Sequence, residues 1–224
     1  MKRIPHDLFA RMADLVSRED RDEMAIPSYL HRNPLMRWMA WRRLEVTADF
    51  FRDFCDTSNN DPGATVMDFG CGTGVLFDEA CKLADTVYGV DIVLEPARLL
   101  VDEWSLDKVT LFDPEQAERE IAAQSVDTII AAEVLEHIDP VESTLAFFRS
   151  RLQPGGTLIV SLPTEGVLYR IGRRLAGFEG HYHESNAASV HKKILAAGFR
   201  RVRMQKIPAP GPLAIYWVIA YQRR

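Results

Sequence analysis

Residues 65–77 read TVMDFGCGTGVLF, an apolar run followed by a glycine-rich turn and then by the expected start of a helix. Glycines allow a sharp turn and a close approach of the backbone to a ligand, while the first turn of a helix offers N–H groups without partners. The next apolar run, VYGVD, ends in Asp91, 17 residues after Gly74. An acid at about this spacing can bind both hydroxyls of a ribose. The stretch therefore predicts a strand–turn–helix unit that binds a nucleotide-like ligand.

Two other nucleotide-binding motifs fit this stretch less well. A dinucleotide dehydrogenase has the pattern G-x-G-x-x-G, but Val75 or Phe77 occupies the third glycine position when the pattern starts at Gly70 or Gly72. The sequence contains no G-x-x-x-x-G-K-[ST] segment, which excludes a P-loop. The spacing thus disfavours both a dehydrogenase and a P-loop enzyme.

After residue 64, short β-rich runs alternate with helical stretches, a pattern typical of a parallel sheet with crossover helices. A helix is expected to end at Ala197-Gly198. The loop PAPGP at 208–212 is short, so the last two runs are expected to pair antiparallel. The expected strands are 65–69, 86–90, 108–112, 125–131, 156–162, 200–207 and 213–221.

A break at residues 58–64, SNNDPGA, separates this alternating region from a helical N-terminal region. Upstream of the break, apolar residues recur at steps of three and four, which predicts a helix of about five turns that begins near Asn33-Pro34. We therefore expect an N-terminal helical cap or lid over residues 1–60 and a ligand-binding domain over residues 61–224. The apolar stripe consists of Trp41, Leu44, Ala48, Phe51 and Cys55.

The composition is that of a globular protein, with 47% hydrophobic and 26% charged residues among 224. The net charge of −5 gives no overall positive field, so nucleic acid is not an expected partner. The three cysteines lack metal-ligand spacing, and the N-terminus lacks the apolar segment of a signal peptide. The longest apolar run, 213–221, is half a membrane span. We expect a cytoplasmic protein without a transmembrane segment.

Five ordered segments give the chain a family resemblance: VMDFGCGTG, VYGVDIV, VDTIIAAEVLEHIDP, LQPGGTLIVSLP and AAGFRRV. Over residues 35–221 it resembles the class I S-adenosylmethionine-dependent methyltransferases, in the broad group of ubiquinone and small-molecule methyltransferases. The resemblance implies an α/β fold with a Rossmann-like, doubly wound sheet of seven strands in the order 3-2-1-4-5-7-6, strand 7 being antiparallel. It also implies S-adenosylmethionine as cofactor, S-adenosylhomocysteine as product, and no metal.

The resemblance implies a role for each cofactor-binding residue. The first acid and the glycine loop would hold the methionine moiety, Asp91 the ribose, and Ile92 the adenine. For Asp91, an N-cap of the helix expected from EPARLL is the alternative. Asp113 would contact the adenine amino group, although a plain helix cap before Pro114 is the alternative. The residues after the fourth strand, and with them His137, would lie beside the transferable methyl group. For Glu136 and His137 the alternative is that they orient the loop and cap the helix that begins near Pro140. The predicted cofactor-binding residues are Asp68, Gly70, Cys71, Gly72, Asp91, Ile92, Asp113, Ala132, Glu133 and Val134.

The acceptor is expected to be a small or lipid-like molecule, methylated on oxygen rather than on nitrogen or carbon. The motifs typical of DNA methyltransferases, [DNS]-P-P-[YFW] and Pro-Cys, do not occur in the sequence. In the N-terminal helix, apolar residues such as Trp38 lie among Arg37, Arg42 and Arg43, which would suit an apolar substrate with an acidic head. A second cap element could come from Tyr169, Arg170, Arg173 and Arg174, or these residues could form a solvated basic face.

A general base helps when the acceptor is a hydroxyl, and imidazole suits this role near neutral pH. His181 and His183, in the segment FEGHYHES, follow the fifth strand and are the candidate bases. An ordinary surface role is the alternative for both histidines, and a zinc site with His191 is disfavoured because no fourth ligand has suitable spacing. A protein that binds the cofactor without catalysis, as a sensor or partner subunit, is the alternative function.

Overall fold

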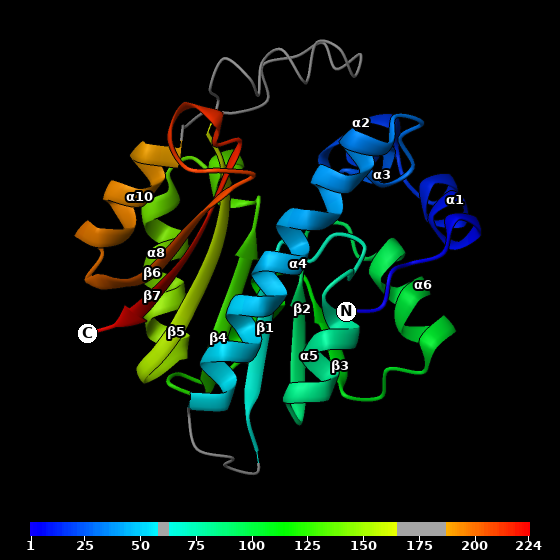
Figure 1. Ribbon diagram of the computed structural model, residues 1–224. Helices are drawn as coiled ribbons and strands as arrows, with labels where there is room; N and C mark the ends of the chain where they lie inside the picture. The colour runs from blue at the N-terminus through cyan, green and yellow to red at the C-terminus, as the bar shows by residue number, and fades with distance from the viewer. Residues whose placement is uncertain (58–62, 165–186) are drawn as a thin grey trace.

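The computed structural model describes residues 1–57, 63–164 and 187–224, and in these ranges the core is one seven-stranded sheet (Figure 1). The strand order is β3-β2-β1-β4-β5-β7-β6, and β7 runs antiparallel to both of its neighbours. This confirms the predicted topology. The strands are β1 (Thr65–Phe69), β2 (Thr86–Val90), β3 (Val109–Phe112), β4 (Val126–Ala132), β5 (Leu152–Pro163), β6 (Phe199–Ile207) and β7 (Tyr216–Arg223).

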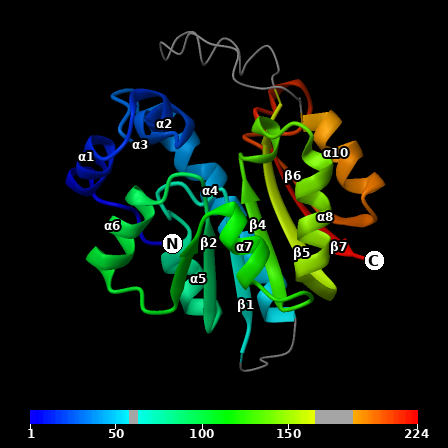
Figure 2. The same cartoon turned by 180° about the vertical axis from the view of Figure 1, so that it is seen from behind.

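Helices cover both faces of the sheet, as Figures 1 and 2 show from opposite sides. Adjacent residues of a strand point to opposite faces, so Val66 packs in the core with α4 and α5 whereas Met67 packs in the core with α8 and α10. Both side chains are fully buried, which makes the sheet the middle of three layers. The covering helices are α4 (Pro34–Thr57), α5 (Phe77–Leu83), α6 (Glu95–Trp104), α7 (Pro114–Glu120), α8 (Val141–Arg151) and α10 (Ala187–Ala196).

The fifth strand begins four residues earlier than predicted, at Leu152 instead of residue 156. Leu152 pairs with Val126, and the register shifts before Thr157 pairs with Thr128. The segment between them contains Gly155 with a φ of +80°, a conformation that glycine adopts without strain. The prediction missed this start because the turn-like residues QPGG form a bulge inside the strand rather than a loop before it.

The predicted N-terminal helix is confirmed as α4, which begins at Pro34. The Asn33 side chain accepts a hydrogen bond from the Leu35 amide at 2.9 Å, which satisfies one free N–H of the first turn. The first four residues of the predicted stripe are buried, and α4 packs against β4, β5, β7 and α5. The second half of the region predicted as a cap is therefore also a layer of the sheet domain. The division at residue 60 stays a prediction, because residues 58–62 lie outside the described ranges.

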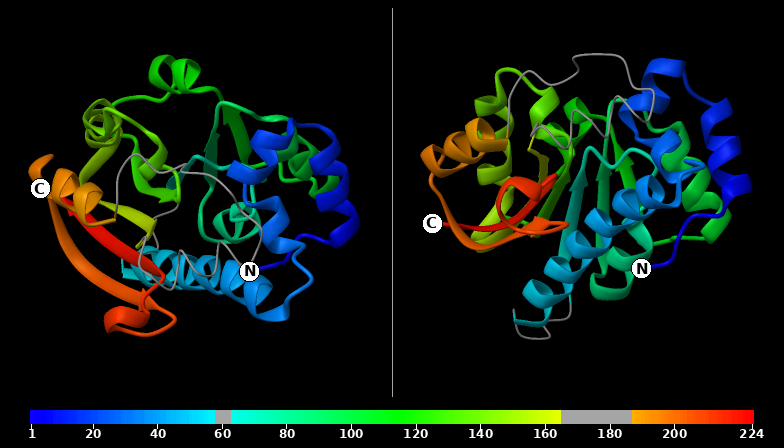
Figure 3. Two further views of the ribbon diagram at one scale, coloured as in Figure 1. Left: turned by 90° about the horizontal axis from the view of Figure 1, so that it is seen from above. Right: turned by 45° about the horizontal axis from the view of Figure 1, so that its top comes forward.

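Three short helices precede α4: α1 (His6–Asp14), α2 (Arg18–Glu23) and α3 (Ile26–Tyr29). The ring of Tyr29 stacks on Phe9 at 5.1 Å and lies 5.1 Å from the ring of Trp41. Aromatic contacts of this kind tie α1 and α3 to α4, and α1 also packs against α6. The result is that α2 and α3 lie over the carboxyl ends of the central strands (Figure 3).

Among the helices in the described ranges, none is both long and apolar enough to span a lipid bilayer.

Candidate functional site

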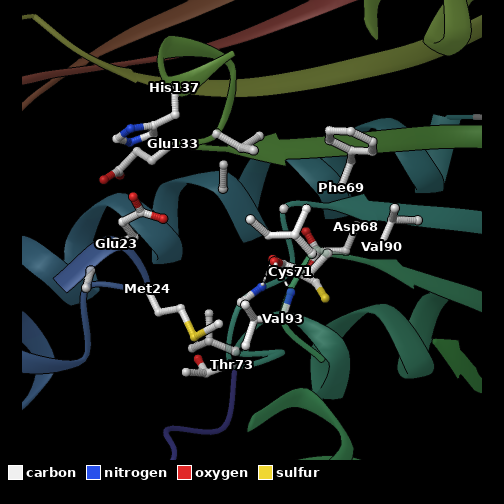
Figure 4. Close-up of a pocket in the computed structure, with 18 of the residues that line it drawn as sticks. Glu23, Met24, Asp68, Phe69, Cys71, Thr73, Val90, Val93, Glu133 and His137 are labelled. Carbon is white, nitrogen blue, oxygen red and sulfur yellow. Dashed lines mark hydrogen bonds between the residues drawn. The ribbon is translucent and has the colours of Figure 1, made fainter. Parts of the chain in front are cut away.

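A cavity of about 490 Å³ lies at the carboxyl ends of β1, β2 and β4 (Figure 4). The glycine loop after β1 forms one wall, and the opposite wall comes from α2, α3 and α4 together with the residues after β4. Ligands of open α/β sheets bind at this edge, where the strand order reverses between β1 and β4. The volume lies in the range of small-molecule and cofactor sites.

The glycine loop has the conformation that its sequence predicts. Gly70 and Gly72 have φ angles of +74° and +51°, where glycine is favoured. The Gly70 and Cys71 amides both donate to the carbonyl of Val90, which fastens the loop to the end of β2. A Cβ atom on Gly70 would lie 2.5 Å from the Cβ of Val134, so the loop packs directly on the residues after β4.

Asp91 connects the glycine loop to the end of β2. Its Oδ2 accepts a hydrogen bond from the Gly72 amide at 2.7 Å, and its Oδ1 accepts one from the Val93 amide at 3.2 Å. Burial raises the pKa of Asp91, although these backbone donors oppose the shift. The residue before the first turn of α6 is Leu94, so Asp91 is not the helix cap that offered an alternative explanation. Its carboxylate lines the cavity instead.

Asp68 lies deeper in the same wall and is 2% exposed. Burial, and secondly the negative charge of Asp91, raises the pKa of Asp68 to about 7. A carboxyl with this pKa is readily ionised by a cation that binds next to it. Cys71 is also buried against the cavity, and burial raises the pKa of its thiol.

The two residues assigned to the adenine differ in the structure. Ile92 lines the cavity with 76% of its surface exposed, so a large apolar side chain is available to a flat ligand. The Asp113 side chain accepts a hydrogen bond from the Gln116 amide at 2.8 Å and forms a capping box at the start of α7. Among the described residues that line the cavity, its neighbour Pro114 is present and Asp113 is not. The helix cap is thus the role observed for Asp113, and its contact with adenine stays a prediction.

Ala132 ends β4, Glu133 and Val134 follow it, and all three line the cavity as expected, as does His137. Glu133 has a φ of +57°, an unusual backbone conformation for a residue with a side chain. Its carboxylate forms an ion pair with Arg43 of α4. Figure 4 shows His137 beside Glu133, with both side chains at the same end of the cavity.

The sequence did not identify the contribution of α2 and of the residue after it. Met24 lies 3.6 Å from the position that a Cβ on Gly72 would take, so it covers the glycine loop. Figure 4 shows the side chain of Glu23 next to that of Glu133, at the same end of the cavity as His137. Burial, and then the charges of nearby acids led by Glu19, raises the pKa of Glu23. A capping box of Ser17 with Asp20 was the available sequence signal for this short helix.

The predicted arginines of α4 have different environments. Arg43 is 5% exposed and lines the cavity. Arg37 donates to the carbonyl of His31 at 3.0 Å, and Arg42 forms a partly exposed ion pair with Glu45. Of the three, Arg43 is therefore the one placed to act on a ligand in the described part of the cavity.

The candidate bases His181 and His183 lie outside the described residues, as do Tyr169, Arg170, Arg173 and Arg174. His191 lies on α10, where its Nδ1 is 2.6 Å from the hydroxyl of Tyr221. Within residues 1–57, 63–164 and 187–224, no group of three or more potential ligands is placed to hold a metal ion.

A family model described as a methyltransferase domain matches residues 38–209. The Ubiquinone biosynthesis O-methyltransferase of Xanthomonas campestris pv. campestris (strain B100) is 28% identical over 169 residues, which cover 70% of this chain and 69% of that protein. The mitochondrial Ubiquinone biosynthesis O-methyltransferase of Rattus norvegicus is 28% identical over 131 residues, which cover 52% of this chain and 38% of that protein. The chain thus spans less than half the length of the rat relative.

Among solved structures, the magnesium protoporphyrin IX methyltransferase of Synechocystis PCC 6803 with bound SAH has a similar fold. The TM-score is 0.64 at 21% sequence identity, and the match covers 97% of this chain and 100% of the other. The family model covers most of the chain, including the glycine loop, Asp91 and the residues after β4. The chain therefore belongs to the methyltransferase-domain family, among the class I S-adenosylmethionine-dependent methyltransferases.

Proposed function

We propose that the protein transfers a methyl group from S-adenosylmethionine to a hydroxyl of a small or lipid-like acceptor. The observation that carries the proposal is the position of the Asp91 carboxylate in the cavity wall. Its Oδ2 accepts a hydrogen bond from the Gly72 amide at 2.7 Å, which holds it there. This arrangement leaves an acid beside a glycine loop at the switch point of the sheet, as binding of an adenosine requires.

The residues of the cavity fit this cofactor. The carboxylate of Asp91 suits two ribose hydroxyls, and the exposed side chain of Ile92 suits the face of an adenine ring. Asp68 lies where a carboxylate can pair with the amino group of the methionine moiety, and Gly70 and Gly72 leave room for that moiety. When bound, the cofactor supplies a methyl group that its sulfonium has already activated.

The protein's own side chains then have two tasks, which are to position the acceptor and to exclude water. Met24 and Tyr29 close the cavity from the N-terminal side. A hydroxyl acceptor must also lose a proton, and His137 is the cavity-lining imidazole within the described residues. We propose His137 as the proton acceptor, alongside the sequence-based candidates His181 and His183.

Oxygen is the proposed target because both curated relatives described above are named as O-methyltransferases. Their printed names also support a lipid-like acceptor. The mixture of apolar residues and ionisable groups in the cavity wall, including Leu44, Ile138 and His137, is compatible with a phenol-like or other hydroxyl-bearing apolar molecule.

The first experiment measures binding of S-adenosylhomocysteine by calorimetry and by thermal stabilisation. We expect binding by the native protein and loss of about 100-fold in affinity in Asp91→Asn, because the amide cannot accept two ribose hydroxyls and also the Gly72 amide. Asp85→Asn is the matched control, since its Oδ2 also accepts a backbone hydrogen bond, from the Gly63 amide at 2.8 Å, but the residue precedes β2 and does not line the cavity. Stabilisation by NAD but not by S-adenosylhomocysteine would overturn the assignment of the cofactor.

The second experiment follows turnover with trideuteromethyl-labelled S-adenosylmethionine and a bacterial lipid and metabolite extract. Mass spectrometry is expected to find the label in a methoxy group. Label on nitrogen or carbon would refute the O-methyltransferase assignment, and cofactor binding without any labelled product would favour the non-catalytic alternative.

A further inference from the structure

Arg43 links three elements around the cavity. Its guanidinium forms an ion pair with Glu133 after β4, and its Nη2 donates to the hydroxyl of Tyr29 in α3 at 3.2 Å. Its Nε donates to the carbonyl of Ala40 one turn earlier in α4, at 3.2 Å. The ring of Tyr216 in β7 lies 5.4 Å from the guanidinium carbon. These contacts fix a permanent positive charge in the cavity wall.

Glu133 is held from the other side by β5. Its amide donates to the carbonyl of Ser161 at 3.0 Å, and the Ser161 hydroxyl lies 3.4 Å from its Oε1. The backbone of Glu133 keeps a left-handed conformation that costs energy for a residue with a Cβ atom, and such strain often lies at functional sites. The adjacent Val134 packs on Gly70, so Glu133 is the neighbour in sequence of a residue that contacts the glycine loop.

The ion pair brings opposite charges together and so contributes little net charge to the cavity. Removing either partner would leave one full charge in a partly buried site, where water screens it less than at the surface. S-adenosylmethionine carries a positive charge on sulfur, and S-adenosylhomocysteine has a neutral sulfur. A change in this balance of charge is therefore felt by the first ligand far more than by the second.

We propose that Arg43, acting through Glu133, sets how strongly the cavity distinguishes cationic S-adenosylmethionine from its neutral product. The inference rests on the proposed function, because it requires both ligands to bind in this cavity. In this role Arg43 is a positioning residue, since it orients and neutralises Glu133 without itself holding the cofactor. A neutral pair keeps the affinity for the reactant moderate, whereas the affinity for the product depends little on this balance of charge.

The test is a double-mutant cycle with Arg43→Gln, Glu133→Gln and the variant that carries both changes. Calorimetry at about pH 8, where a carboxyl that has lost its cation remains ionised, gives the affinity of each protein for the two ligands. The measured quantity is the ratio of the affinity for S-adenosylmethionine to that for S-adenosylhomocysteine. Arg43→Lys, which keeps the charge but loses the planar fork, serves where Arg43→Gln does not fold.

We expect the ratio to rise about tenfold in Arg43→Gln, to fall about tenfold in Glu133→Gln, and to return to the native value in the double variant. Arg43→Lys is expected to keep the ratio within about twofold of the native value, because the charge balance is retained. Equal loss of affinity for both ligands in Arg43→Gln, with no compensation by Glu133→Gln, would show instead that Arg43 binds a group common to both. A lower melting temperature with an unchanged ratio would overturn the inference in favour of a structural role. Failure of the native protein to bind either ligand would refute the proposed function itself.

Discussion

The two walls of the cavity are built in different ways. The wall of β1, the glycine loop and Asp91 comes from residues 68–93 and is fixed by backbone geometry, as in the hydrogen bond from the Gly72 amide to Asp91. The opposite wall brings together Tyr29, Arg43 and Glu133, which lie far apart in the sequence and are joined by side-chain contacts. The first wall is held by hydrogen bonds within residues 68–93, whereas the second depends on the packing of α3 and α4.

This difference predicts that the two walls have different functional roles. Under the proposed function, the local wall contains Asp68 and Asp91, the acids assigned to the cofactor, whereas the assembled wall contains the ion pair of Arg43 and Glu133. We therefore expect substitutions in the local wall to lower the affinity for both S-adenosylmethionine and S-adenosylhomocysteine. Substitutions in the assembled wall are expected to change turnover and the preference between these two ligands, while the affinity for S-adenosylhomocysteine stays nearly unchanged. The predictions below test these roles.

The largest expected effect follows from Gly70→Ala. The new Cβ would lie 2.5 Å from Val134, at a φ of +74° that alanine adopts poorly, so we expect loss of at least about 100-fold in affinity for S-adenosylhomocysteine and of about 2–4 kcal/mol in stability. Calorimetry and chemical denaturation measure the two quantities.

Gly211→Ala is the matched control for this substitution. Gly211 has a similar φ of +79°, but no atom lies within 4 Å of the position of its Cβ. It is expected to lose about 1 kcal/mol of stability from backbone strain and to bind the ligand normally. Native affinity of Gly70→Ala for S-adenosylhomocysteine would contradict the claim that the close contact between Gly70 and Val134 is needed to bind the ligand.

His137→Gln tests the assembled wall through turnover. If His137 accepts the proton of a hydroxyl acceptor, the labelled-methyl assay is expected to slow about 100-fold while the affinity for S-adenosylhomocysteine stays unchanged. The control His191→Gln changes a histidine of α10 whose Nδ1 lies 2.6 Å from the hydroxyl of Tyr221 in β7. This variant is expected to keep full turnover. Native turnover in His137→Gln would leave His181, His183 or simple proximity as the source of catalysis.

The same contrast explains which features could be predicted from the sequence. The strand order came from the family resemblance, and the glycine loop and Asp91 were identified because their geometry is encoded within about 25 residues. The apolar stripe of α4 was equally readable, since burial of a helix follows its periodicity. The glycine loop, Asp91 and the stripe of α4 depend on local conformation, and the structure has them where they were expected.

The assembled wall was harder to predict because it depends on tertiary packing. Arg42 and Arg43 are neighbours in the sequence, yet a rotation of about 100° per residue places Arg42 in a partly exposed ion pair with Glu45 and Arg43 in the cavity wall. Nothing local distinguishes them. Likewise, Glu23 and Met24 reach the cavity because Tyr29 packs on Phe9 and Trp41, a set of contacts with no sequence signature.

A smaller effect is expected from the titration of Asp68. Its pKa of about 7 in the free cavity should fall when a ligand ammonium binds beside it, so binding releases protons. Affinity for S-adenosylhomocysteine is then fully present above pH 7 and falls by up to about tenfold per pH unit as the pH drops below 7. Calorimetry between about pH 5.5 and pH 7.5 measures the slope.

Asp68→Asn should flatten this pH profile, whereas Asp85→Asn, which alters an acid before β2 that does not line the cavity, should retain it. A steep profile in Asp68→Asn would assign the titration to another group, such as Asp91 or Glu23, whose pKa values burial also raises.

The smallest expected effect is that of Tyr29→Phe, which removes one hydrogen bond from the assembled wall. The ring keeps its stacking on Phe9, but Nη2 of Arg43 loses its 3.2 Å contact with the hydroxyl. We expect a loss of about 1–2 kcal/mol in stability, turnover lowered a few-fold, and an unchanged affinity for S-adenosylhomocysteine. Tyr221→Phe removes a hydroxyl that lies 2.6 Å from His191, remote from the cavity, and should lose stability without losing turnover. A fall of tenfold or more in the affinity of Tyr29→Phe for S-adenosylhomocysteine would contradict the proposed roles of the two walls. A side chain of the assembled wall would then control the binding of a ligand assigned to the local wall.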